Sequence, residues 1–156
     1  MNADSLTEEN CALSMMMDLS NILFKIKTGP ILKKHNLTPS ALSVLLFLYR
    51  NPDKNTASEI CASSPVKRGI VSTVIDSLCK RGLLRQERDE NDRRIQRLYL
   101  NEDSNIIISD IKNVLDDIAT KASECLSENE RKIANICIEK MVVFFQEEIE
   151  KEKKNG

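Results

Sequence analysis

The sequence predicts a mostly α-helical protein that contains one short two-stranded β-hairpin. Apolar residues recur at helical spacing along most of the 156 residues, and helix-start signatures divide the chain into segments. One pair of short segments joined by a charged turn instead has the pattern of a hairpin. With 41% hydrophobic residues, the chain can form one compact domain, or a small domain with additional long helices.

Four helix starts are well marked. The spacing S/T-x-x-E allows a hydroxyl and a carboxylate to satisfy free amides of the first helical turn. The pairs with this spacing are Ser5 with Glu8, Thr56 with Glu59, and Ser127 with Glu130. Thr38-Pro39 marks another start, because proline at the first helical position has no amide to leave unsatisfied.

The N-terminal part predicts two helices. The first covers about residues 7–27, has a broad apolar face, and is disrupted near its end by Gly29-Pro30. The second covers residues 39–50 and stops at Asn51-Pro52. Its expected buried residues are Leu42, Leu45, Leu46 and Tyr49.

Two shorter helices and the hairpin follow. We expect helices at residues 57–62 and about 67–81, the second of which ends at Gly82, a residue typical of C-terminal caps. Its expected buried stripe is Ile70, Val71, Val74, Ile75 and Leu78. Strands at 84–88 and 95–100 then form a ribbon that must pack on the helices, because two strands alone are marginally stable.

Two long helices complete the chain. Asn101 is expected to cap the first of them, and the second runs from Glu128 toward Glu150, with a charged tail at 147–154 that frays. Like the first helix of the chain, both carry an apolar face outside the compact centre. Pairing with a second copy explains these faces economically, since two-fold dimers are the commonest assemblies. The alternative is packing within a single chain.

The predicted fold class is therefore mostly α, with a winged helix-turn-helix at its centre. The two short helices and the four-residue turn between them make the helix-turn-helix, and the two-stranded ribbon makes the wing. We assign residues 38–100 to this region. Residues 5–35 and 101–152 are assigned to N- and C-terminal dimerisation helices.

Charge is unevenly distributed along the chain. Residues 63–99 carry nine Lys or Arg against five Asp or Glu, which gives them a net charge of +4, whereas the whole chain is −1 and the remainder is therefore −5. A basic patch on an otherwise acidic protein attracts phosphate groups electrostatically, so nucleic acid is the first partner to consider.

Other classes of function lack support in the sequence. The five cysteines include no close CxxC pair, which argues against a disulfide scaffold and a zinc site, and His35 is expected to be a solvated loop residue. No catalytic constellation or phosphate loop is present, so we expect neither an enzyme nor a cofactor or metal. The longest apolar run, 41–48, is too short for a membrane span, and residues 1–5 do not start an export signal. We expect a cytoplasmic protein without a membrane partner.

Three central segments share a specific pattern: TASEI at 56–60, VSTVIDSLCKRGLL at 71–84, and DENDRR at 89–94. Together they resemble the MarR (multiple-antibiotic-resistance regulator) family of dimeric bacterial transcription factors, and the resemblance extends over nearly the whole chain. It implies a homodimeric repressor without catalysis that binds a pseudo-palindromic operator in double-stranded DNA. The helix at 67–81 would enter the major groove and the wing the minor groove.

The resemblance also implies roles for particular residues. Lys67, Arg68, Ser72 and Thr73 would face bases and phosphates, and Arg94 would be the minor-groove arginine, with Asp92 orienting the arginines beside it. Arg93 and Arg97 are further candidate DNA contacts, although arginines at these positions can equally serve to solvate a ribbon. Asn91 replaces the basic residue common in the family, so one wing contact would be missing.

Control of DNA binding has two candidate forms. Many family members release DNA when a small aromatic or lipophilic effector binds, and Met16 and Met17 are candidate pocket residues, although a Met stripe also suits a core or dimer interface. A redox branch senses peroxide through a cysteine of the first helix. Cys11 is the candidate here, but it lies about one helical turn before the expected position, near Ser14, and lacks the accompanying tyrosines.

Two alternatives to a ligand-released repressor therefore stay open. One is a thiol-based redox-sensing regulator, in which one cysteine has a depressed pKa. The other is a winged-helix protein-interaction module that does not bind DNA. The basic patch and the wing arginine favour a DNA-binding regulator over this last alternative.

Overall fold

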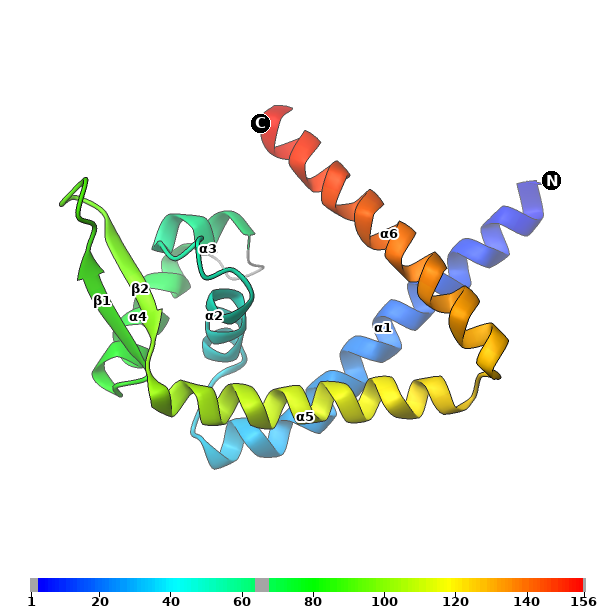
Figure 1. Cartoon of the computed structure of the whole chain (residues 1–156), viewed down its shortest axis with the longest axis horizontal. Coiled ribbons are helices and arrows are strands. Elements are labelled where there is room, and N and C mark those ends of the chain that lie inside the picture. The colour runs from blue at the N-terminus through cyan, green and yellow to red at the C-terminus, as the bar shows by residue number, and fades with distance from the viewer. Residues whose placement is uncertain (1–2, 64–67, 156) are drawn as a thin grey trace. The chain divides into compact units, whose positions relative to one another are not determined.

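The computed structural model describes residues 3–63 and 68–155, with side chains described from 12 to 62 and from 68 to 152 (Figure 1). The elements in chain order are α1 (Ala3–Lys34), α2 (Pro39–Arg50), α3 (Ala57–Ser63), α4 (Arg68–Lys80), β1 (Leu84–Arg88), β2 (Gln96–Leu100), α5 (Glu102–Glu124) and α6 (Glu128–Asn155). The chain divides within α5 into two compact units, one ending at Leu115 and the other starting at Asp116.

The core of the first unit lies where α2, α3, α4, the hairpin and the start of α5 converge. Its fully buried side chains include Leu45 of α2, Ile60 of α3, Leu78 of α4 and Ile107 of α5. Burial of such side chains supplies the main favourable free energy of folding, about 1.5–3 kcal/mol for each large aliphatic residue. The helix-turn-helix is therefore held by one continuous core.

The N-terminal caps of α2 and α3 have the expected geometry. The hydroxyl of Thr38 accepts a hydrogen bond from the amide of Ala41 at 3.1 Å. The Thr56 amide donates to Glu59 Oε2 at 2.9 Å, while the Glu59 amide donates back to Thr56 Oγ1 at 3.3 Å. These reciprocal bonds form the capping box that the sequence predicts, so α3 has a fixed start.

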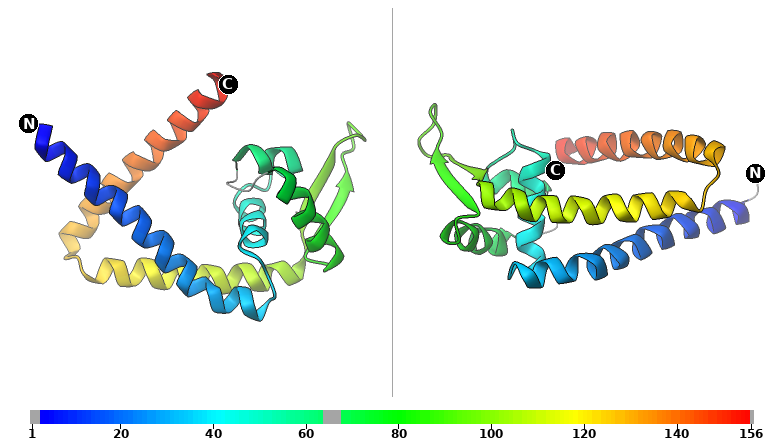
Figure 2. Two further views of the ribbon diagram at one scale, coloured as in Figure 1. Left: turned by 180° about the vertical axis from the view of Figure 1, so that it is seen from behind. Right: turned by 60° about the horizontal axis from the view of Figure 1, so that its bottom comes forward.

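The hairpin is antiparallel, with Leu84 opposite Leu100 and Arg88 opposite Gln96, and its turn projects away from α3 and α4 in both views (Figure 2). Gly82 ends α4 with a φ of +69°, a left-handed conformation that glycine adopts without a Cβ penalty. The amide of Leu83 then donates to the carbonyl of Leu78 at 2.9 Å. This turn directs the chain from α4 straight into β1.

Helix α1 differs from the sequence prediction at both ends. It begins at Ala3, before Ser5, and continues through Pro30 to Lys34. Pro30 and Ile26 are both exposed, so water can replace the hydrogen bond that the proline removes. The stop is instead provided just after Lys34 by Asn36, whose φ is 47°, and the amide of Leu37 donates back to the carbonyl of Leu32 at 2.8 Å.

Three other local expectations were wrong. Tyr49 is 42% exposed and Ile70 is 45% exposed, because the buried stripes run through Leu45 and Leu48 in α2 and through Val71 and Val74 in α4. Asn101 does not act through its side-chain oxygen at the start of α5. Its side-chain amide donates to the Gly82 carbonyl at 2.8 Å, so it ties α5 to the end of α4.

The second unit consists of the end of α5 and α6. Ser127 and Glu130 form the expected capping box, in which the Ser127 amide donates to Glu130 Oε2 at 2.8 Å. Helix α6 continues to Asn155, beyond the predicted fraying point, and its charged end includes a Lys151–Glu148 ion pair at 2.6 Å. No helix in the described part of the chain combines the length and apolar character needed to cross a membrane.

Candidate nucleic-acid interface

Helix α4 has one buried face and one open face. Val71, Val74, Ile75 and Leu78 are buried, whereas Arg68, Ser72 and Thr73 are exposed. Because the buried residues follow one stripe of the helix, the hydroxyls of Ser72 and Thr73 lie on the surface that a groove of DNA can approach. Lys67, the other candidate from the helix expected at about 67–81, falls outside the described residues.

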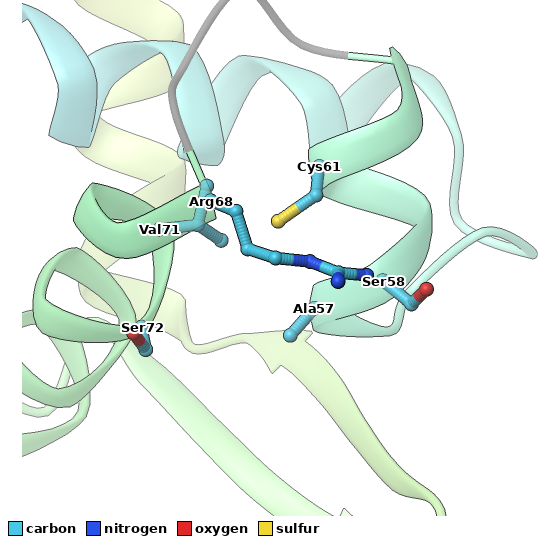
Figure 3. Close-up of a pocket in the computed structure, with 6 residues that line it drawn as sticks. All are labelled: Ala57, Ser58, Cys61, Arg68, Val71 and Ser72. Carbon is cyan, nitrogen blue, oxygen red and sulfur yellow. The ribbon is translucent and has the colours of Figure 1, made fainter.

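A pocket of about 260 Å³ lies between α3 and the start of α4 (Figure 3). Its lining residues are Ala57, Ser58, Cys61, Arg68, Val71 and Ser72. The Arg68 side chain extends from α4 across this pocket, and its guanidinium lies beside Ser58 (Figure 3). The arrangement brings a positive charge to the junction of the two helices of the helix-turn-helix, in a pocket whose wall also includes Ser72.

The tip of the wing presents Arg94 almost entirely to solvent. Its side chain is 91% exposed, and its Nε and Nη2 atoms donate to the two carboxylate oxygens of Asp92 at 3.0 and 2.9 Å. This bidentate pair lowers the pKa of Asp92 and raises that of Arg94. The structure thus places Asp92 where it can orient Arg94, while Arg93 beside it is also exposed.

Arg97 lies in a different environment. Only 33% of its side chain is exposed; its Nε donates to Asp89 Oδ2 at 2.5 Å and its Nη1 donates to Asn55 Oδ1 at 2.9 Å. It therefore neither solvates the ribbon nor projects freely like Arg94. Sequence reasoning missed both partners: Asp89 lies eight positions away across the hairpin, and Asn55 lies 42 positions away.

Asp89 organises the turn of the wing. Its Oδ1 atom accepts hydrogen bonds from the amides of Asp92 and Asn91 at 3.0 and 2.9 Å. The amide of Asp92 and then the Arg97 guanidinium are the main causes that lower the pKa of Asp89 from 3.8 to about 2. Asp89 is therefore a charged anchor of the wing at neutral pH.

The turn between α1 and α2 connects two other helices of the first unit. Asp110 of α5 accepts from Lys34 Nζ at 3.0 Å and lies 3.2 Å from His35 Nε2, so the expectation that His35 is a solvated loop residue was wrong. Only 19% of the His35 side chain is exposed. At the end of α4, Arg81 donates to the carbonyls of Asn36 and His35 at 2.8 and 2.6 Å.

The candidate effector and redox residues lie on α1. Met16 and Met17 are 55% and 47% exposed, as parts of an open apolar face. Cys11 belongs to α1, but its side chain is outside the described part. Among the described cysteines, which are all free thiols, burial raises the pKa of Cys79, with a further contribution from Asp76. The described residues include no cluster able to hold a metal ion.

Known proteins with related sequences and folds match this arrangement. The model of the MarR family matches residues 35–95, which span the helix-turn-helix and most of the wing. The HTH-type transcriptional regulator MgrA of Staphylococcus aureus is 29% identical over 124 residues, covering 80% of this chain and 82% of MgrA.

Two solved structures are similar over most of the fold. A MarR family protein from Bacillus stearothermophilus has a TM-score of 0.74 at 22% identity, covering 94% of this chain and 99% of that chain. The S. aureus MepR–DNA complex has a TM-score of 0.62 at 20% identity, covering 85% of this chain and 98% of MepR. With the capped helix-turn-helix, the basic wing and these similarities taken together, residues 35–95 match the MarR family, and the chain is a winged-helix, DNA-binding transcriptional regulator.

Proposed function

We propose that this regulator is a cytoplasmic homodimeric repressor of a pseudo-palindromic operator, released by a small aromatic or lipophilic effector. The observation that carries the DNA-binding part is the geometry of the wing, in which Asp92 aligns a 91% exposed Arg94 on the same unit as the open face of α4. The similarity to MepR, which has been solved with DNA, supports the same reading. The proposed DNA contacts are Lys67, Arg68, Ser72, Thr73, Arg93 and Arg94.

Homodimerisation is supported by the open apolar faces of α1 and α6. A single chain leaves Ile26 65% exposed and Ile133 61% exposed, and large exposed apolar patches mark interaction sites. Other exposed apolar side chains on these helices are Met15, Met16, Met17, Leu19, Ile22, Leu23, Ile136, Ile138, Val142, Val143, Phe144, Phe145 and Ile149. A second copy is the occupant that also supplies the second reading helix of a symmetric operator.

The test of this function is selection of binding sequences from a pool of random duplexes, followed by affinity measurements at two salt concentrations. We expect a pseudo-palindromic sequence to be enriched, and its affinity to fall steeply as salt rises, because protein cations displace counterions from phosphate. Sedimentation at micromolar concentration should give a dimer. Failure to bind any duplex at low salt would instead favour the protein-interaction module.

Substitutions on α4 and at Lys67, the residue before it in the sequence, should separate base reading from phosphate binding. We expect Ser72→Ala and Thr73→Ala to change which duplex is preferred, because both side chains lie on the exposed face of α4 that would enter the groove. Lys67→Ala should weaken all duplexes alike and reduce the salt dependence by about one unit in the logarithmic slope. A uniform loss in all three variants would mean that α4 does not read bases.

Release should depend on a ligand and not on peroxide. The sequence neighbours of Cys11 are Glu8, Glu9 and Asn10, and nearby carboxylates disfavour a reactive thiolate. Cys11→Ser should therefore leave operator binding unchanged, with or without peroxide. An effector from a panel of aromatic acids should weaken operator binding by both the wild-type protein and Cys11→Ser. The loss equals the difference between the effector's affinities for the DNA-binding and the released states, typically about 1–3 kcal/mol. Peroxide-dependent release that disappears in Cys11→Ser would establish the redox alternative.

A further inference from the structure

Arg97 joins the turn of the wing to the segment that precedes α3. Its Nε donates a hydrogen bond to Asp89, and its Nη1 donates a hydrogen bond to Asn55. Asp89 in turn accepts the amides of Asn91 and Asp92, which form the turn that carries Arg94. A continuous chain of hydrogen bonds therefore leads from the start of the helix-turn-helix to the tip of the wing.

The Asn55 end of this chain is firmly fixed. Asn55 is only 4% exposed, and its carbonyl accepts the amide of Leu98 at 2.8 Å. The next residue, Thr56, forms a β-bridge with Arg97 and the N-terminal capping box of α3. The guanidinium of Arg97 is thus anchored to the same backbone that sets where α3 begins.

Charge and exposure separate Arg97 from the arginine at the wing tip. The Arg94 side chain is 91% exposed, whereas Arg97 is 33% exposed and its partner Asp89 only 9% exposed. A phosphate contact needs an accessible guanidinium, but two of the three nitrogens of Arg97 already donate to protein oxygens. Arg97 is therefore suited to contacts within the protein and not to contacts with nucleic acid.

We propose that Arg97 is a positioning residue of the wing, which with Asp89 and Asn55 sets the distance between Arg94 and the reading helix α4. This inference rests on the proposed DNA-binding function, because its consequence is the spacing between the groove positions that the wing and α4 contact. It moves Arg97 from the DNA contacts to the residues that act through Arg94. We refer to Arg97, Asp89 and Asn55 as the wing clamp.

Whether substitution of Asp89 raises or lowers operator affinity distinguishes the wing clamp from a purely electrostatic effect. Asp89→Asn removes a negative charge from a surface that approaches phosphate, so charge alone predicts tighter binding. The wing clamp predicts the opposite, because the amide that replaces the carboxylate no longer attracts the guanidinium of Arg97. We expect operator affinity to fall about tenfold, which corresponds to about 1.4 kcal/mol.

Substitutions of Arg97 provide a second, independent distinction. Arg97→Met keeps the apolar stem and removes the guanidinium, and Arg97→Lys keeps the charge but cannot donate the two forked hydrogen bonds. We expect both variants to lose operator affinity about tenfold while the slope of log affinity against log salt stays unchanged. Arg93→Met, the matched control at the exposed tip, should instead reduce that slope by about one.

The wing itself can be followed without DNA, by amide hydrogen exchange at Asn91 and Asp92. Exchange at these amides should become faster in Arg97→Met and in Asp89→Asn, and stay unchanged in Arg93→Met. The losses in affinity should not add in the Arg97→Met, Asp89→Asn double variant, because each variant breaks the same contact. If Arg97→Met does not fold, the Asp89→Asn and Arg97→Lys variants provide the same comparison.

The possible outcomes separate the inference from the function on which it rests. A reduced salt slope in Arg97→Met with unchanged amide exchange would identify Arg97 as a phosphate contact, and unchanged operator affinity would remove its positioning role; either result overturns the proposal. Tighter binding by Asp89→Asn would also overturn it. A wild-type protein that binds no duplex would contradict the proposed function, and amide exchange would still report whether the clamp holds the turn.

Discussion

Insertion of five base pairs at the centre of the operator should reduce the affinity of the full-length dimer by about 100-fold or more. Two reading helices related by a two-fold axis meet major grooves about one helical turn, or about 34 Å, apart. Five added base pairs rotate the second half-site to the opposite face of the duplex, so one head loses its contacts. The advantage of binding both half-sites at once, typically about 10²–10⁴-fold, is then lost.

The control for this experiment keeps the length of the operator constant. Scrambling the five central base pairs changes their sequence without rotating the half-sites, so affinity should change much less than it does on insertion. Equal binding to the native and lengthened operators would contradict the symmetric dimer. It would also leave the open apolar faces of α1 and α6 without a role in DNA recognition.

Arg94→Ala should lower operator affinity by about 1–3 kcal/mol without changing the melting temperature. The side chain is 91% exposed and its hydrogen bonds to Asp92 lie at the surface, so its loss leaves no cavity and no buried partner unsatisfied. Binding isotherms and thermal melts of the same preparations provide the measurement. Lys132→Ala, which removes the same charge from α6, is the matched control and should leave operator affinity nearly unchanged.

An Arg94→Lys variant shows what the wing arginine contributes beyond its charge. Lysine keeps the positive charge but cannot form the bidentate pair with Asp92. Recovery of only part of the lost affinity would indicate that the orientation set by Asp92 matters. Unchanged affinity in both Arg94 variants would remove this residue from the proposed DNA contacts.

Local rules predicted most of the central fold, because the signals there come from residues close together in the sequence. The Thr56–Glu59 pair is three residues apart, and the structure forms the capping box that this spacing predicts. Gly82 likewise ends α4 through its own backbone conformation. The helix-turn-helix and the wing could therefore be placed from sequence to within about two residues.

The errors arose where two local rules competed or where a helix lacked a distinct polar face. Pro30 predicted the end of α1, but Asn36 provided the actual stop in its left-handed conformation. In α2 the run 41–48 is almost entirely apolar, so sequence periodicity did not define which side is buried, and Tyr49 was assigned to the wrong face. Burial in such a helix depends on its neighbours in the fold.

The contacts around the candidate interface could not be derived from spacing alone. Arg97 reaches Asn55 across 42 positions, and Arg81 reaches the carbonyl of His35 across 46. Sequence patterns identify arginines in a basic segment without showing which ones face solvent. Only the folded arrangement distinguishes the exposed Arg94 from the half-buried Arg97.

The link between Arg81 and the turn after α1 has a consequence for how this protein tolerates change during evolution. Both acceptors are main-chain carbonyls, at 2.8 and 2.6 Å, and every amino acid provides such a carbonyl. Position 35 can therefore vary without loss of this link, whereas position 36 is limited to residues that accept a φ near 47°. Variation at Arg81 is more restricted, since Arg81 donates from two separate nitrogens, Nη1 and Nη2, and the single nitrogen of a lysine does not reproduce this fork.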